Sequence, residues 1–392
     1  MSGAGRSPMG PGDVRDAVES VRLRLSREPG ELTPARVAMA LRQEGRPVGD
    51  ATVLAVLDAL RGEVVGAGLL EPLVTAPGVT DVLVNGPHHV YVDRGDGLER
   101  VDVAFADDDA VRRLAQRLAA AGGRRLDDAT PFVDVRLRDG TRLHAVLAPV
   151  ARRGTCLSLR VPSRRSFGID DLVASGSVPQ SGARLLRDLV KARLAFLVSG
   201  GTGSGKTTLL ATLLGLVDPA ERLVLVEDSA ELDPDHAHVV TLEARPPNVE
   251  SAGEVSVRDL VRQALRMRPD RLVVGEVRGA EVTDLLAALN TGHEGGCGTV
   301  HANSAADVPA RIEALALAAG LPRAAAHSQF AAALDCVIHL DRGRDGQRRL
   351  REVAVPLRGD DGLVSMQTAV VFEGSRSRAG PAADVLGVRL ER

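Results

Sequence analysis

The segment Gly200–Thr208 contains the residue types that hold a chain of phosphates. Its sequence, Gly-Gly-Thr-Gly-Ser-Gly-Lys-Thr-Thr, fits the pattern G-x-x-x-x-G-K-[ST]. Glycines let backbone amides wrap around phosphate, the lysine reaches the β- and γ-phosphates, and the first threonine hydroxyl binds Mg²⁺. We therefore expect this phosphate-binding loop (P-loop) to bind ATP and Mg²⁺, with Thr207 as the metal ligand, through Gly200, Gly201, Thr202, Gly203, Ser204, Gly205, Lys206, Thr207 and Thr208.

Polar side chains also follow three apolar segments downstream of the P-loop. Glu227, Glu276 and His301 each come at or just after the end of such a segment, which has the composition of a buried strand. In an open parallel sheet, ligands bind outside the carboxyl ends of the strands. One sheet would therefore bring these three residues to the same edge as Lys206.

Each of these residues has a catalytic and a structural interpretation. Glu276 stands where a P-loop ATPase keeps its second acidic motif, with Gly275 where an aspartate is common. It can orient or deprotonate the attacking water or hold Mg²⁺ through water; otherwise it is an exposed loop residue. Glu227 is either catalytic or part of a helix cap. His301 either senses the γ-phosphate or an interface, or hydrogen-bonds its own loop. We expect the catalytic interpretation for all three.

Arginines recur at helical spacing in the segment Ser256–Arg266. Arg258, Arg262 and Arg266 share one face, opposite an apolar face. This stripe is equally consistent with a solvated basic surface and with a subunit contact that senses the nucleotide.

The elements that position these residues follow from the hydrophobic pattern. Strands alternate with helices in the second half of the chain, as in a parallel α/β sheet. Hairpin signals and one helix, Asp107–Ala121, indicate an α+β module before it. We expect helices on the face Val14–Leu25, from Thr33 and from Asp50. The predicted organisation is disorder over 1–12, a helical segment 13–66, an α+β domain 67–161, a hinge 162–168 and an α/β domain 169–392.

Composition excludes several classes of protein. The 392 residues are 44% hydrophobic and 26% charged, which excludes a wholly disordered chain. The net charge of −3 and the aromatic content of 2% argue against direct nucleic-acid binding. Three cysteines exclude a disulfide scaffold and fit a reducing cytoplasm. We expect neither a membrane-spanning segment nor a signal peptide, because no apolar run is long enough and the first residues are rich in Gly, Pro and Ser.

Taken together, these segments resemble the ATPases of type II and type IV secretion systems and type IV pili, and most closely the tight-adherence (Tad, or Flp) pilus ATPases. The resemblance extends from about Glu71 to about Leu340. It rests on the P-loop and on four further stretches: Val226–Leu232, Leu242–Asn248, Arg266–Gly279 and Asn290–Ser304.

The resemblance implies roles for particular residues. The α/β domain would be RecA-like, and the α+β domain would cover the nucleotide. Glu276 matches the family's atypical Walker B glutamate and His301 its histidine box, while an acidic box corresponds to Glu227, Asp228 and Glu231. Arg142 and Arg160 match the arginines that such a covering domain supplies to the γ-phosphate.

The resemblance further implies a cytoplasmic Mg²⁺-ATPase, a ring hexamer at the inner face of the cell membrane. It would drive an inner-membrane platform that assembles a pilus or exports a substrate. One alternative is a conjugation motor for DNA transfer. Another is a nucleotide-binding assembly scaffold that hydrolyses little or no ATP.

Overall fold

The fold is that of a computed structural model, which divides into two compact units, Met1–Ser163 and Arg164–Arg392. The residues that the structure describes are 21, 24, 33–44, 49, 52–54, 56–57, 66–95, 97–162, 167–245, 247, 252–292, 294–343 and 345–391.

Helix α2 (Pro34–Gln43) is the helix predicted from Thr33. The Thr33 hydroxyl accepts a hydrogen bond from the Arg36 amide and proline occupies the first turn, which together define the start of the helix. The predicted disorder over 1–12, most of the face Val14–Leu25, the cap Asp50 and the centre of the predicted hinge lie outside the described residues.

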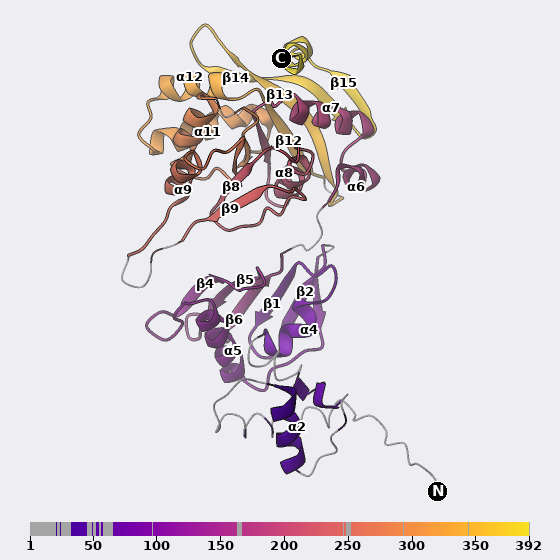
Figure 1. The fold of residues 1–392 in the computed structure, drawn as a ribbon, viewed down its shortest axis with the longest axis vertical. Helices are drawn as coiled ribbons and strands as arrows, with labels where there is room; N and C mark the ends of the chain where they lie inside the picture. The colour runs from indigo at the N-terminus through magenta and orange to yellow at the C-terminus, as the bar shows by residue number, and fades with distance from the viewer. Residues whose placement is uncertain are drawn as a thin grey trace. The chain divides into compact units, whose positions relative to one another are not determined.

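The first unit contains a six-stranded antiparallel sheet in the order β3-β2-β1-β6-β5-β4. One face of this sheet packs on α5 (Asp108–Ala121), α4 (Glu71–Val74) and the 3₁₀ turn η1 (Gly68–Leu70) (Figure 1). Successive side chains of a strand point to opposite faces, so a second, outer face bears the alternate residues. The predicted α+β module corresponds to the strands β1 (Asp81–Asn85), β2 (Val90–Asp93), β3 (Leu98–Val101), β4 (Phe132–Arg136), β5 (Arg142–Val146) and β6 (Cys156–Arg160).

The second unit is built on a nine-stranded sheet in the order β15-β14-β13-β12-β7-β11-β10-β8-β9. The six strands from β12 to β9 are parallel, as predicted, and the last three strands of the chain extend the sheet in antiparallel fashion, which was not predicted. The strands are β7 (Phe196–Gly200), β8 (Leu223–Glu227), β9 (Val239–Glu243), β10 (Arg271–Val274), β11 (Cys297–His301), β12 (Cys336–Arg342), β13 (Arg348–Arg358), β14 (Val364–Glu373) and β15 (Arg376–Ala379).

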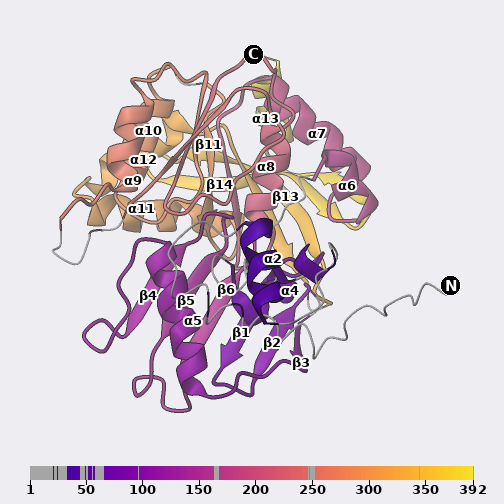
Figure 2. The same ribbon diagram turned by 60° about the horizontal axis from the view of Figure 1, so that its bottom comes forward.

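Helices cover both faces of this sheet and create two apolar cores. Helices α6, α7, α8 and α13 pack on one face, and α9 to α12 pack on the other (Figure 2). The bounds are α6 (Ile169–Ala174), α7 (Gln180–Lys191), α8 (Lys206–Leu214), α9 (Val257–Ala264), α10 (Glu281–Leu289), 3₁₀ turn η2 (Ala305–Asp307), α11 (Val308–Ala318), α12 (Arg323–Ala333) and α13 (Ala383–Leu390).

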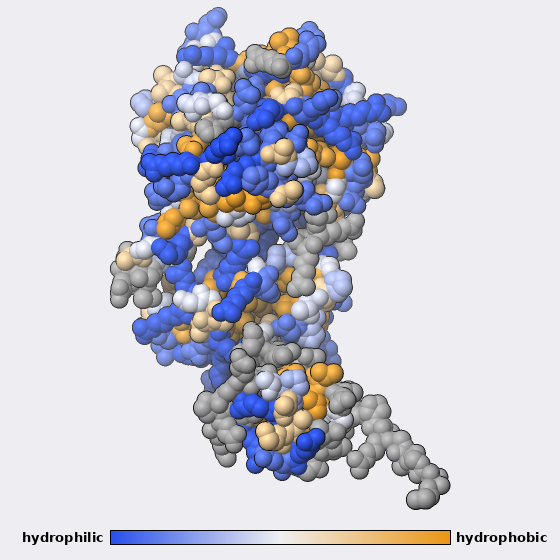
Figure 3. Space-filling model, viewed as in Figure 1, coloured by the Kyte–Doolittle hydropathy of each residue, from blue (hydrophilic) through white to orange (hydrophobic). Residues whose placement is uncertain are grey.

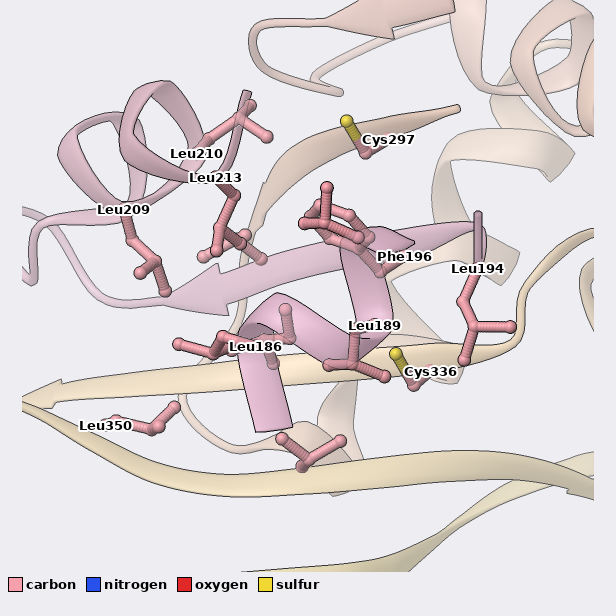
Figure 4. Packing of buried hydrophobic residues seen from close by; sticks show 14 of the residues in the cluster. Leu186, Leu189, Leu194, Phe196, Leu209, Leu210, Leu213, Cys297, Cys336 and Leu350 are labelled. Carbon is pink, nitrogen blue, oxygen red and sulfur yellow. The ribbon is translucent and has the colours of Figure 1, made fainter. Parts of the chain in front are cut away.

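Phe196 of β7 lies in the apolar core that α7 and α8 form on this face of the sheet (Figure 4). Leu209 and Leu213 of α8 and Leu186 of α7 belong to the same cluster. Cys336 is fully buried there as well, and burial raises the pKa of its thiol. This packing fixes the helix that carries Lys206 to the strand that precedes it.

Hydrophilic side chains are spread over the surface seen in Figure 3, with apolar side chains in smaller groups between them. None of the helices among the described residues combines the length and the apolar character that a membrane-spanning helix needs.

Candidate active site

The P-loop connects the end of β7 at Gly200 to the start of α8 at Lys206. Gly203 and Gly205 have φ angles of +71° and +94°, which L side chains rarely adopt. A Cβ atom on Gly200 would lie 2.5 Å from the Leu340 carbonyl oxygen. The loop therefore requires glycine at these three positions, as is typical of loops whose backbone amides wrap an anion.

Lys206 is 6% exposed, although it carries a charge. Its Nζ atom donates to the carbonyl oxygens of Gly200 and Gly201, both at 3.1 Å. Burial lowers the pKa of this ammonium group, while the nearby carboxylate of Glu276 acts to raise it. The lysine is thus held against the backbone of the loop, beside the place where a phosphate chain would lie.

A continuous chain of polar contacts runs from Lys206 to the acidic residues. Lys206 Nζ lies 3.4 Å from the ring nitrogens of His301, and His301 Nε2 lies 3.0 Å from Glu276 Oε1. Arg278 pairs with both oxygens of Glu276 at 2.7 Å and with Asp228 Oδ2 at 3.0 Å. The carboxyl ends of β7, β8, β10 and β11 thus carry one connected charged cluster, which we call the edge cluster (Lys206, His301, Glu276, Arg278 and Asp228).

The edge cluster favours an ionised Glu276 and a neutral His301. Burial alone would raise the pKa of Glu276, but the hydrogen bond and charge of Arg278 bring it below its ordinary value. Burial and the positive charge of Lys206 lower the pKa of His301. A neutral ring that donates from Nε2 to Glu276 leaves Nδ1 free to accept from Lys206. In this series of contacts, Glu276 is the carboxylate that follows directly after Lys206 and His301.

Glu227 lies at the same edge but outside this chain of contacts. Its side chain is 3% exposed, and Oε1 accepts hydrogen bonds from the amides of Glu231 and Leu232, both at 3.0 Å. Oε2 is buried and has no hydrogen-bond partner among the described residues. Burial raises the pKa of this carboxyl to about 7.

Gly275 makes room for the Glu227 side chain. A Cβ atom at position 275 would lie 2.6 Å from Glu227 Cγ, closer than real Cβ contacts. An aspartate at position 275 is therefore incompatible with the observed position of Glu227, which gives a physical reason for glycine where an acidic motif often has aspartate.

The P-loop residues fit a phosphate chain and Mg²⁺. Ser204 Oγ is buried without a hydrogen-bond partner among the described residues, within the loop itself. Such an orphaned donor gains a partner when an anion enters the loop. Mg²⁺ takes one or two protein ligands and completes its shell with phosphate oxygens and water. Thr207, in the first turn of α8, would supply one such protein ligand, and Glu276 would hold the ion through water.

Arg142 and Arg160 stand side by side in the first unit, directly opposite each other on β5 and β6. Arg142 makes a bidentate pair with Asp134, at 3.0 and 2.7 Å, and Arg160 lies 3.9 Å from Asp81. Arg136 of β4 is opposite Arg142 in the same row. Asp81 of β1 is in turn opposite Arg160, so this row places three arginines next to one aspartate on one face of the sheet.

The arginine stripe of α9 is shorter than predicted. The helix ends at Ala264, so Arg266 lies beyond it. Arg258 and Arg262 both pair with Asp284 of α10, at 2.7 and 2.8 Å. These two arginines therefore tie α9 to α10 within the chain.

Arg278 and Arg348 were missed by the sequence analysis. Arg278 stands two residues after Glu276 in the loop after β10, and this short spacing is a usable signal that the two side chains can pair. Arg348 Nε donates to the Gly203 carbonyl oxygen at 3.0 Å, but the two residues are 145 positions apart. No local pattern could have indicated the second contact.

A model of the type II/IV secretion system protein family matches residues 63–363. The chain belongs to this family. A putative conjugal transfer protein of Mycobacterium tuberculosis is 59% identical over 342 residues, which are 86% of this chain and 96% of that protein. The type IV secretion system protein PtlH of Bordetella pertussis is 31% identical over 313 residues, covering 72% and 92% of the two chains.

Among solved structures, the pilus retraction motor PilT with bound ADP is similar to this type II/IV secretion system protein with a TM-score of 0.51. The identity is 19%, and the match covers 80% of this chain and 82% of that one. This similarity confirms the predicted fold, a P-loop ATPase domain preceded by an α+β domain.

Proposed function

We propose that this protein is a Mg²⁺-dependent ATPase that powers a secretion or pilus machine. The observation that carries the proposal is the chain of contacts from Lys206 through His301 to Glu276, beside a P-loop of the required shape. It joins a cation placed to bind phosphate to an ionised carboxylate, which are two of the groups that P-loop enzymes use in phosphoryl transfer.

The residues divide the chemistry among them. ATP supplies the phosphoanhydride bond, and Mg²⁺ offsets its negative charge. Lys206 stabilises the β- and γ-phosphates, and Thr207 holds the metal. Glu276 accepts the proton of the attacking water or holds Mg²⁺ through water. The neutral ring of His301 contacts both Lys206 and Glu276 and holds their side chains in position.

Glu227 acts as a positioning residue in this proposal. Its carboxyl holds the amides of the loop after β8, which also carries Asp228. Arg142 and Arg160 would close over the γ-phosphate, where a guanidinium matches the charge that develops during transfer. A closing first unit of this kind turns hydrolysis into motion.

The assembly that the motor serves has two candidates. The P-loop and the four further sequence stretches that resemble this family support the tight-adherence pilus branch. A motor of this branch would be a ring hexamer that works on an inner-membrane platform from the cytoplasmic face. The names of relatives such as the putative conjugal transfer protein of Mycobacterium tuberculosis support DNA transfer equally. Neighbouring genes for small pilin-like and polytopic proteins would favour the first, and a relaxase gene the second.

The oligomeric state of the protein in solution tests the proposed ring hexamer. We expect light scattering to show a larger assembly when a non-hydrolysable ATP analogue is added. A strictly monomeric protein with full ATPase activity would contradict a ring motor.

The Glu276→Gln variant separates a motor from a scaffold. We expect it to bind Mg²⁺–ATP normally and to turn over about 10²–10⁴-fold more slowly, because the base is lost while the phosphate site is kept. Phosphate release and nucleotide titration measure the two properties on the same samples. If the wild-type protein binds ATP but releases no phosphate above the variant's rate, the scaffold alternative is correct.

A further inference from the structure

The hairpin formed by β12 and β13 touches the P-loop at its base. His339 of β12 lies opposite Ser199 of β7, and Ser199 Oγ is 2.9 Å from His339 Nδ1. Both side chains are buried, with 0% and 5% exposure. The next residue, Leu340, brings its carbonyl oxygen against Gly200. β7, which leads into the P-loop, is therefore joined to β12, the first strand of the hairpin, just before β7 ends.

Two arginines of the same hairpin reach the outer side of the P-loop. Arg348 Nε donates to the Gly203 carbonyl oxygen at 3.0 Å. The Arg348 stem also lies along Gly205, since its Cδ would be 3.2 Å from a Cβ placed there. Arg342 Nη1 would be 3.5 Å from a Cβ on Gly203. The hairpin thus covers the stretch Gly203–Gly205 with positive charge.

This contact acts on the part of the loop with the least ordinary backbone. Gly203 and Gly205 both have positive φ, and a glycine backbone left alone samples many other conformations. A side chain that bridges the two restricts that freedom. A carbonyl that accepts from a guanidinium also polarises its peptide, so the following amide, that of Ser204, becomes a better donor.

We propose that Arg348 is a positioning residue for nucleotide affinity: it fixes the outer side of the P-loop and, with Arg342, adds positive charge beside a bound polyphosphate. The proposal rests on the nucleotide site proposed above. It assigns a role to the last part of the sheet, which otherwise only extends the fold.

Arg348→Ala tests the proposal, with Arg351→Ala as the matched control. Arg351 lies on the same strand, loses the same charge and pairs with Asp341 within the hairpin. We expect Arg348→Ala to weaken the Kd for Mg²⁺–ADP and Mg²⁺–ATP about tenfold, the usual size for a hydrogen bond from a charged group. Arg351→Ala should stay within about twofold of the wild-type protein. Titration calorimetry measures each Kd.

Two further readouts separate positioning from general damage. At saturating ATP, kcat of Arg348→Ala should stay within about twofold while KM rises, because the edge cluster is untouched. Arg348→Lys should recover most of the affinity, since it keeps a charged donor. Wild-type affinity in Arg348→Ala, or an equal loss in Arg351→Ala, overturns the proposal. A wild-type protein that binds no nucleotide overturns the proposed function itself, which the same titration reports separately.

Discussion

The two edges of the parallel part of the nine-stranded sheet use the same residue types in opposite ways. At the amino edge, Arg271 begins β10 and is 2% exposed. Its guanidinium pairs twice with Glu221, at 2.8 and 3.2 Å, and donates to the Val190 carbonyl at 3.0 Å. At the carboxyl edge, Arg278 pairs with Glu276 and Asp228, yet 56% of its side chain is exposed.

The difference lies in whether the arginine can change partners. Arg271 is enclosed, so its ion pair contributes to a fixed structure. Arg278 is held by charge but open to water. A phosphate can therefore compete for its guanidinium, and a metal ion can compete for the carboxylates of Glu276 and Asp228. We therefore expect the amino edge to serve stability and the carboxyl edge to serve chemistry.

Substitution of Arg271 should lower the free energy of unfolding more than substitution of Arg278 does. Arg271→Met leaves Glu221 largely buried with less compensation, and breaking a buried pair from one side costs about 3–5 kcal/mol. Urea unfolding measures the free energy, and the folded fraction should bind ATP with unchanged affinity. The double variant Arg271→Met/Glu221→Gln should lose less than the single variant. Unchanged stability of the single variant would refute the distinction between the edges.

The pH dependence of stability should differ between the two glutamates of the carboxyl edge. The pKa of Glu227 is raised to about 7 from an ordinary 4.5. Its contribution is therefore most favourable below about pH 4.5 and declines as pH rises through 7, because folding then keeps an ionised carboxyl buried. The decline amounts to about 3 kcal/mol.

Glu227→Gln should remove this decline, so the variant gains stability relative to the wild-type protein between pH 5 and pH 8. Glu276, whose pKa is lowered, contributes stability above its ordinary pKa and loses it as pH falls. Glu276→Gln should therefore show the opposite trend toward acid pH. Parallel pH profiles for the two variants, from chemical unfolding, would contradict the difference in environment.

The smallest expected effects come from the arginines of the first unit. Each of Arg142→Ala and Arg160→Ala should lower turnover at least about tenfold, but by less than the roughly 10³–10⁵ that a single such arginine contributes in other P-loop enzymes. ATP affinity should change less than turnover. Arg113→Ala on α5, a helix that packs on the opposite face of the sheet, is the control. Normal turnover in both variants would make this unit an adaptor.

Local patterns were sufficient for the P-loop, for its flanking strand and helix, and for the strand ends that carry Glu227, Glu276 and His301. Contacts between segments that are far apart in the sequence could not be predicted from local patterns. Arg271 lies within the stretch Arg266–Gly279, which resembles the family. Its partner Glu221 is 50 positions away, so the burial of the Arg271 side chain could not be predicted from the sequence.

The antiparallel strands β13 to β15 were missed for a related reason. The sequence signals for a parallel α/β sheet end with the last strand–helix alternation, and the remaining strands pair through hairpins. The contact of Arg348 with the P-loop arises only from that pairing. Sequence patterns identified the site's elements, while the fold determines which charged groups surround it.

The two lysines of the chain offer the most direct test of the nucleotide site. Lys206 is buried in the P-loop, and Lys191 is exposed at the end of α7. Titration calorimetry with Mg²⁺–ATP should show tight binding by the wild-type protein and by Lys191→Ala, and no measurable binding by Lys206→Ala, because the cation of the phosphate cradle is lost. Near-normal affinity in Lys206→Ala would contradict the assignment of the carboxyl edge as the nucleotide site.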